Sequence, residues 1–332
     1  MPDLAPMAVR RERRPAQTNP LAVPPRLPLH RLSWRGAGMA LLAVLGALTG
    51  ASLLGVIWPK PDRSAHLRDE ITASALAPKP RDPVTVLVIG SDADREGAPI
   101  NGAAPRGPAN SDVVLLVRVD RKSPLRVLQV PSELAVSLPD REEPVALRDL
   151  YRLGGVALTA DALRALLKLE NGAPDRYIVL PRQALRDLVD ALGGVEVSPP
   201  RSMKYRDQTL KYTIDLQGGL QRLSGDKVEQ MVRYRDKWLG EQSRRTNQRL
   251  VLTGLLTQLS QPAQLAQLPT LIPAWTGQVD TNLNQREMLS LLAASLDNPR
   301  PAQFDTLPLL PATKEFGDLR QLDPAAGQPR WP

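Results

Sequence analysis

The sequence predicts an α/β fold, with helices packed on a sheet in two or three layers, preceded by one transmembrane helix. Three observations lead to this expectation: short β-branched apolar runs, longer runs whose leucines have helical spacing, and a 22-residue segment without charge. Strands and helices are mixed along the chain without strict alternation, which is typical of a layered α/β domain.

Short apolar runs predict the strands. Residues 84–90 form a continuous run rich in valine, the pattern of a strand that is buried on both faces. Further strands are expected at 112–119, 125–130, 177–180 and 195–197, with an edge strand at 304–310.

Helices are predicted where apolar residues recur every three or four positions. The expected helices are 160–169, 183–192 with Gly193 and Gly194 at its end, 242–259 with four inward-facing leucines, and 285–296. Ser224 is expected to be the N-cap of a further helix. Residues 265–275 are apolar but contain Pro269 and Pro273, so at most short helical turns are expected there.

Residues 37–58 contain no charged side chain. As a helix they would be roughly 33 Å long, enough to cross a hydrocarbon core of about 30 Å. The 36 residues before them carry seven arginines against Asp3 and Glu12, a net charge of +5. The positive-inside rule therefore predicts a single-pass protein of the cell (inner) membrane, with a cytoplasmic N-terminus and an extracytoplasmic main domain. A cleaved signal peptide is the alternative, but the apolar run is long and begins late for one.

The chain is expected to divide into five parts. In order these are a disordered basic tail at 1–36, the transmembrane helix at 37–58, a linker at 59–82, the α/β domain at 83–260, and a C-terminal segment at 261–332 that packs on the domain and ends in a loose tail.

The charge distribution argues against a nucleic-acid partner. The chain has a net charge of +8, and its tail accounts for +5 of this. The high isoelectric point is therefore mostly a property of the tail. Positive charge is concentrated again at 226–249, which carries seven basic and four acidic residues.

The residue inventory excludes several kinds of catalytic site. There is no cysteine, so disulfides, thiolate nucleophiles and zinc–cysteine sites are absent. The two histidines, His30 and His66, lie before the predicted domain. Any catalysis is thus expected to use carboxylates, arginines or a cation that prefers oxygen ligands.

An arginine cluster at 233–248 is the strongest candidate site. Arg233, Arg235 and Arg244 fall within twelve positions, and Gln248 lies one helical turn beyond Arg244. Guanidinium groups suit phosphate oxygens because they offer a planar fork of donors. The alternative is a solvated basic helix, the usual fate of a run of charges.

Two aspartates form a second candidate site. Asp92 follows the first predicted strand, where α/β sheets place ligands, and Asp112 begins the second. If these strands are neighbours, both carboxylates converge on one cation. The alternative is that both side chains only cap turns or strands.

The order of short motifs resembles the LytR-CpsA-Psr (LCP) family of cell-wall glycopolymer transferases. The motifs are Gly-Ser-Asp at 90–92, Ser-Asp at 111–112, Leu-Val-Asp-Ala-Leu-Gly-Gly-Val at 188–195, Leu-Ser-Gly at 223–225, Arg-Tyr-Arg at 233–235, and Arg-x-x-x-Gln at 244–248. The resemblance covers residues 83–258.

The resemblance implies a three-layer α/β/α domain with a mixed central sheet and a hydrophobic tunnel for a polyprenyl chain. It implies transfer of a phospho-glycopolymer from a polyprenyl-(pyro)phosphate lipid to peptidoglycan or another envelope acceptor, assisted by Mg²⁺. Trp238 is expected in the core, the commoner fate, or at the tunnel entrance. The matched residues are Asp92 and Asp112 for the metal, Arg233, Arg235, Arg244 and Gln248 for the pyrophosphate, and Asp92, Asp112 and Arg235 for catalysis.

Several positions depart from the family pattern. Residues 110–112 are Asn-Ser-Asp where the family usually has Arg-Ser-Asp, and residues 131–133 are Pro-Ser-Glu in place of Pro-Arg-Asp. Arg148 is an added cation that would bind pyrophosphate in a variant site. The alternative is a catalytically weak or inactive polyprenyl-phosphate binder. A transcriptional attenuator is a third hypothesis, disfavoured because the 36-residue tail has no helix-turn-helix pattern.

Overall fold

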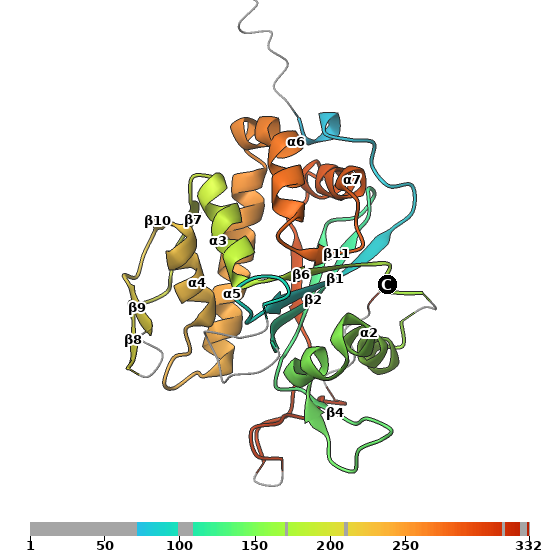
Figure 1. The fold of residues 1–332 in the computed structure, drawn as a ribbon, viewed down its shortest axis with the longest axis vertical. Coiled ribbons are helices and arrows are strands. Elements are labelled where there is room, and N and C mark those ends of the chain that lie inside the picture. The colour runs from blue at the N-terminus through green and yellow to red at the C-terminus, as the bar shows by residue number, and fades with distance from the viewer. Residues whose placement is uncertain are drawn as a thin grey trace, which may run out of the picture. The chain divides into compact units, whose positions relative to one another are not determined.

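A six-stranded mixed sheet forms the centre of the fold in the computed structural model, which describes residues 72–98, 109–169, 172–208, 212–313, 316–325 and 331. β1 lies in the middle, antiparallel to β2 and parallel to β6, and the edge strand β12 is parallel to β3 (Figure 1). In spatial order the strands are β11 (Asp280–Thr281), β6 (Arg176–Leu180), β1 (Val84–Ser91), β2 (Ser111–Val119), β3 (Arg126–Val130) and β12 (Gln303–Thr306).

Alternate residues of β1 pack against helices on opposite faces of the sheet. Leu87 and Ile89 are fully buried in a cluster with α2, whereas Val86 belongs to a cluster with α6 and α7. Figure 1 shows α2 on one side of the sheet and α6 and α7 on the other. This arrangement confirms the expectation of a mixed sheet between layers of helices. The helices are α2 (Leu147–Leu167), α3 (Arg182–Ala191), α4 (Gly225–Arg233), α5 (Glu241–Leu259), α6 (Pro262–Thr276) and α7 (Gln285–Leu296), after a short 3-10 turn, η2 (Ala73–Ala75).

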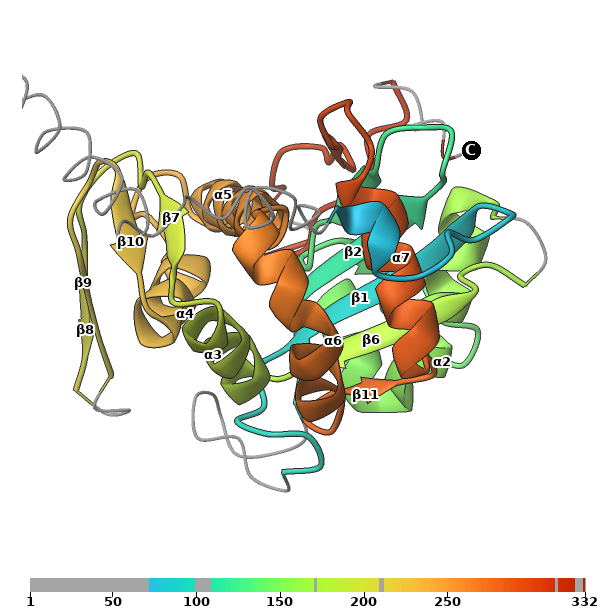
Figure 2. The ribbon, with the colours of Figure 1, turned by 90° about the horizontal axis from the view of Figure 1, so that it is seen from above.

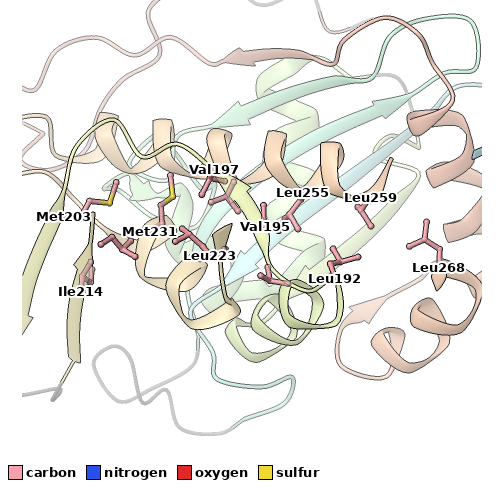
Figure 3. Close-up of a cluster of buried hydrophobic side chains, with 14 of the residues drawn as sticks. Leu192, Val195, Val197, Met203, Ile214, Leu223, Met231, Leu255, Leu259 and Leu268 are labelled. Carbon is pink, nitrogen blue, oxygen red and sulfur yellow. The ribbon is translucent and has the colours of Figure 1, made fainter. Parts of the chain in front are cut away.

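A second hydrophobic core lies beside the sheet, among α3 to α6 and small ribbons of strands (Figure 2). Val195, Val197 and Leu223 of the ribbon β7–β10 face Leu255 and Leu259 of α5 (Figure 3). Residues such as Val195 have no exposed surface, so this unit buries a core of its own. The ribbon strands of this core are β7 (Val195–Val197) with β10 (Gln221–Leu223) and β8 (Met203–Asp207) with β9 (Tyr212–Leu216), whereas β4 (Ala135–Val136) and β5 (Val145–Ala146) form a ribbon that packs with α2.

Helix α5 connects the two cores. Its Leu255 and Leu259 pack in the second core, while Leu252 and Leu256 pack against β2 and β3 of the sheet. The four leucines expected to face inward therefore divide between two surfaces. This places the N-terminal end of α5, with its basic side chains, beside the edge of the sheet.

Two sequence-based expectations about local structure are wrong. Residues 262–276 form one helix, α6, that continues through Pro269 and Pro273 because its apolar face is held in the cores by Leu265, Leu268 and Ile272. Trp238 is not a core residue but is 84% exposed.

The helix before β6 also differs from expectation. It begins at Leu147 rather than at residue 160, and Gly154 and Gly155 interrupt it with a kink. Gly155 has a φ of 64°, in the left-handed region that glycine occupies readily.

The segment from residue 261 onward supplies both edge strands of the central sheet, β11 and β12. Beyond β12 it returns along β4, where Leu134 bridges to Arg320, and it closes on itself through Leu309 and Leu322. The predicted tail at 1–36 and the predicted transmembrane helix at 37–58 lie outside the described residues. Within the part of the chain that the structure describes, no helix has the length and apolarity needed to cross a membrane.

Candidate active site

Polar side chains gather at the edge where β1 and β6 end. Both strands are parallel, so the loops that follow them leave the sheet on the same side. Asp92 follows β1, and Arg182 begins α3 directly after β6. Arg182 Nη1 lies 2.7 Å from Glu229 Oε1, and its other nitrogen pairs with Asp94.

Asp92 is a buried structural acceptor at this edge. Its side chain is almost inaccessible, with 7% of the residue exposed. Asp92 Oδ1 accepts a hydrogen bond from the backbone nitrogen of Asn110 at 2.8 Å, and Asp92 N donates to Asn110 O at 3.1 Å. The carboxylate thus fixes the entry into β2, two residues before Asp112.

Arg244 is held in a buried network at the centre of the site. The residue is 3% exposed, and its guanidinium bonds Asp112 Oδ1 and Ser132 Oγ, each at 2.8 Å. It also lies 2.7 Å from Glu241 Oε2. Burial alone would lower the pKa of Arg244, but Asp112 and Glu241 outweigh it and raise the pKa. Arg244 is therefore a fixed cation whose charge is already matched by two acids.

Arg235 and Arg148 are the accessible cations of the site. The Arg235 side chain is half exposed and pairs with Glu241 at 2.9 Å. Its pKa is lowered, first by partial burial and then by the positive charge of Arg244, with Arg148 adding to the effect. Neighbouring like charges destabilise one another, and an anion with two or more charges would relieve that repulsion.

Arg233 and Gln248 lie near these cations, and the side chain of each already makes contacts within the protein. Arg233 Nη1 donates to Glu229 Oε1 at 3.1 Å, and its guanidinium lies 4.2 Å from the centre of the Tyr212 ring. Gln248 Oε1 accepts from Gln129 Nε2 at 2.8 Å, and its Nε2 donates to the carbonyl of Val232 at 3.3 Å. Both residues line the apolar pocket described next.

An apolar pocket opens beside these polar groups. It has about 1060 Å³ of space not filled by atoms, part of it open to solvent. The sheet contributes one wall and α3, α4 and α5 the other, through side chains that include Val88, Leu115, Val127, Leu185, Leu252 and Leu255. Asp112, Arg233 and Gln248 lie on the lining as well. The predicted tunnel for a lipid chain therefore has a counterpart in the structure.

Sequence reasoning missed an ion cluster on the wall of this pocket. Glu229, with only 4% of its side chain exposed, accepts from Arg182, Arg186 and Arg233. The signal available in the sequence is the spacing of Glu229 and Arg233, and of Arg182 and Arg186, which puts each pair on one helical face. Ser132 and Glu241 were also not predicted as contacts of Arg244.

The predicted metal residues partly fit a magnesium ion. Mg²⁺ is commonly held by one or two carboxylates together with substrate phosphates and water. Asp92 and Asp112 sit at one edge of the sheet, and Asp112 has a third of its side chain exposed on the pocket side. Among the described residues no group of three or more acidic or histidine side chains could hold a metal without such help. The donor set therefore fits such an ion only in part, because Asp92 Oδ1 and Asp112 Oδ1 already accept from Asn110 N and Arg244 Nη1.

Comparison with known proteins shows the family of this chain. The model of the LytR_cpsA_psr family matches residues 60–312.

The chain belongs to the LytR_cpsA_psr family.

Several of its relatives carry names from cell-wall synthesis. The polyisoprenyl-teichoic acid–peptidoglycan teichoic acid transferase TagU of Enterococcus faecalis is 22% identical over 250 residues, which cover 74% of this chain and 76% of TagU. TagU of Bacillus anthracis is 23% identical over 63% of this chain and 64% of its own length. The crystal structure of B. subtilis TagV has a TM-score of 0.60 at 18% identity, over 74% of this chain and 93% of that one. The likeness to TagV concerns the fold.

Within this family member, the predicted site residues fall into three groups. Asp112, Arg148, Arg235 and Arg244 surround one polar centre, since Arg244 pairs with Asp112 and its charge and that of Arg148 both act on Arg235. Arg233 and Gln248 line the apolar pocket next to it. Asp92 stands at the same strand edge but is bonded to the backbone of Asn110.

Proposed function

We propose that this chain transfers a phosphate-linked glycopolymer from a polyprenyl-(pyro)phosphate carrier to peptidoglycan or another acceptor of the cell envelope. The observation that carries the proposal is the apolar pocket that opens beside a cluster of arginines. An amphiphile with a long apolar chain and a phosphate head matches both halves of that arrangement. The names of the relatives, which are teichoic acid transferases, point to the same reaction.

The proposed reaction is a substitution at phosphorus. A hydroxyl oxygen of the acceptor forms a bond to phosphorus and gives up its proton to solvent, the bond from phosphorus to the bridging oxygen of the pyrophosphate breaks, and polyprenyl phosphate leaves with the displaced electron pair. Such reactions are accelerated mainly by positioning the groups and neutralising charge. Arg148 and Arg235 are the accessible cations for that purpose, and Asp112 and Asp92 would hold a Mg²⁺ that supplies further charge neutralisation on the phosphates.

The location of the reaction follows from the same proposal. A polyprenyl carrier resides in a membrane, and the predicted transmembrane helix at 37–58 would keep the domain at the membrane surface. The positive-inside rule puts the domain on the extracytoplasmic side, where envelope acceptors lie.

A second function, lipid-phosphate binding without efficient transfer, is favoured by the ion pairing in the site. Arg244 is matched by Asp112 and Glu241, Arg233 by Glu229, and Arg235 by Glu241, so three of the five predicted phosphate ligands already have carboxylate partners. A phosphate has to compete with those partners for the guanidinium groups.

The test separates head-group binding from folding. In the full-length protein purified from membranes, Arg235→Ala is expected to reduce the amount of co-purifying polyprenyl (pyro)phosphate about tenfold or more, because a charge-assisted phosphate contact is lost. Its unfolding temperature is expected to stay nearly unchanged, since the Arg235 side chain is half exposed. Native mass spectrometry measures the lipid, and Arg152→Ala, at a surface pair with Asp149, is the matched control.

The outcomes distinguish the two functions. Lipid bound by the parent together with glycopolymer transfer in a reconstituted assay establishes the transferase. Lipid bound without transfer establishes the weak or inactive binder. A parent protein that neither carries nor takes up polyprenyl phosphate contradicts both.

A further inference from the structure

Trp238 is displayed to solvent by a tightly bonded loop. The indole is 84% exposed, although burial of a tryptophan would stabilise the fold. Asp236 Oδ1 accepts from the backbone nitrogens of Trp238 at 2.8 Å and Leu239 at 3.1 Å, and Gly240 N donates to Asp236 O at 2.8 Å. The loop also joins α5, since Asp236 N donates to Ser243 Oγ at 2.7 Å. A fixed loop that holds out a large aromatic ring presents a ready contact surface for a ligand.

The indole stands at the rim of a large polar cleft. The cleft encloses about 2350 Å³ of space not filled by atoms, part of it open to solvent. Its lining offers amide, hydroxyl, carboxylate and guanidinium groups, including Gln242, Thr246, Glu133 and Arg245. An aromatic face next to many hydrogen-bonding groups matches a sugar, whose ring has an apolar face and a rim of hydroxyls.

Glu133 supplies an acceptor that the fold itself does not use. The residue is 6% exposed, and its Oε1 pairs with Arg245. Its Oε2 is buried and has no hydrogen-bond partner among the described residues. A buried carboxylate oxygen without a partner destabilises the fold, and a ligand hydroxyl donating to it would remove that cost.

The far wall of the cleft is built by the C-terminal segment. Arg320 N donates to Glu133 O at 2.9 Å, and Ala135 N donates to Arg320 O at 2.8 Å. Gly317, Asp318 and Arg320 all line the cleft, and they lie beyond residue 312, where the family match ends. Part of this wall therefore lies outside the matched family domain.

The cleft is positively charged and continuous with the phosphate site. Its lining residues include six cations and three acids. Gln129, Arg249 and Thr306 line both this cleft and the apolar pocket. A saccharide in the cleft would thus lie next to the arginines that face the phosphate, and an acidic saccharide would be favoured.

We propose that this cleft is a binding subsite for a saccharide that carries carboxylate groups, with Trp238 stacked on a sugar ring and Glu133 accepting from a hydroxyl. This proposal rests on the proposed transfer reaction, in which the subsite would bind the acidic glycan acceptor. Removing an exposed aromatic that anchors a ligand typically weakens binding about tenfold or more.

The experiment measures saccharide binding to the full-length protein by isothermal titration calorimetry. The probe is a soluble peptidoglycan tetrasaccharide that retains its stem-peptide carboxylates, and neutral chitotetraose is the comparison. We expect the acidic probe to bind more tightly, Trp238→Ala to weaken it about tenfold or more, and Trp238→Tyr to restore most of the affinity. Leu220→Ala is the matched control, because Leu220 is an exposed apolar residue (73%) that is not among the cleft's lining residues.

Each outcome bears on one hypothesis. Equal binding by parent and Trp238→Ala, or no binding of either sugar, overturns the subsite. Loss of binding to anionic phospholipid vesicles in Trp238→Ala, with saccharide binding unchanged, overturns it in favour of a membrane contact. If the subsite is overturned but every variant still carries polyprenyl phosphate, the proposed function stands. If the protein binds the saccharide but takes up no polyprenyl phosphate, the subsite stands and the proposed function fails.

Discussion

At the scale of single residues, Glu229 shows how the fold tolerates a carboxylate beside an apolar pocket. Its side chain is 4% exposed and is bonded by Arg182, at 2.7 Å, Arg186 and Arg233. Burial alone would raise the pKa of Glu229, but the three guanidinium groups outweigh it and hold the pKa below its ordinary value of 4.5. The charged form is thus the stable one in the folded protein.

This shift predicts how stability depends on pH. A carboxyl whose pKa is lower in the folded state stabilises the fold above its unfolded pKa, and that contribution is lost as pH falls through the folded pKa. We expect the free energy of unfolding to decrease as the pH is lowered from about 4.5. In Glu229→Gln this decrease is expected to be less steep, by up to about 1.4 kcal/mol per pH unit. At neutral pH the same change is expected to cost about 3–5 kcal/mol, because three cations lose their shared partner.

Urea unfolding followed by circular dichroism between pH 3 and pH 7 checks this expectation. Asp161→Asn is the control, since the Asp161 side chain is 66% exposed. If the unfolding free energy of Glu229→Gln changes with pH in parallel with that of the parent protein, Glu229 takes no part in the loss of stability in acid.

The residue scale also shows what the sequence could not predict. Arg233, Arg235 and Arg244 could be predicted as site residues because they lie within twelve positions of one another in the sequence. Their partners could not, because Asp112 and Ser132 are more than a hundred positions from Arg244. The exposure of Trp238 could not be predicted either, because it depends on the conformation of a loop in which Trp238 N and Leu239 N donate to Asp236 Oδ1.

At the scale of elements, a close contact between α3 and α4 explains two of the sequence motifs. Gly225 N, at the start of α4, donates to Asp190 Oδ1 of α3 at 2.7 Å. A Cβ on Gly225 would stand only 2.6 Å from Arg186 Cα and would also meet the Arg186 carbonyl. Glycine at 225 and aspartate at 190 are therefore required for these helices to approach so closely. α4 in turn carries Glu229 and Arg233 to the pocket.

Gly225→Ala is expected to destabilise the protein by about 1–3 kcal/mol, because the new methyl group has only backbone to displace. It is also expected to weaken polyprenyl phosphate binding, since α4 must move and Arg233 moves with it. Thermal unfolding and native mass spectrometry of the full-length protein measure the two effects. Gly277→Ala is the matched control, as the nearest atom to its Cβ would be the Ala274 carbonyl oxygen at 3.9 Å. Equal stability of both variants would contradict the close contact.

Elements were predictable where local patterns and tertiary packing agree. The buried run at 84–90 and the helix at 285–296 were predicted with their observed bounds or within one residue of them. The helix α6 was not, because two prolines argue locally against it while Leu268, which has no exposed surface, holds it in place. Tertiary burial outweighs the local preference here.

At the scale of the whole described domain, the apolar pocket lies where its two cores face each other. The sheet provides Val88, Leu115 and Val127, and α5 provides Leu252 and Leu255. Apolar side chains around a space that is not filled give up packing contacts, so the fold is less stable than a filled version would be. A ligand chain that fills the space would restore those contacts, which is the physical reason to regard the pocket as a lipid site.

Filling the pocket with protein atoms tests this argument. Leu252→Trp is expected to abolish polyprenyl phosphate binding while leaving the binding of inorganic pyrophosphate within about twofold, because the arginines are untouched and only the space for the chain is lost. Stability is expected to stay the same or rise, as a side chain added to a cavity gains contacts without overpacking. Thr253→Trp adds a tryptophan at the next position, which is exposed on the same helix, and should leave both ligands bound. Native mass spectrometry for the lipid and calorimetry for pyrophosphate give the two readouts. If Leu252→Trp holds polyprenyl phosphate as well as the parent protein does, the chain is bound elsewhere and the pocket is only a packing defect.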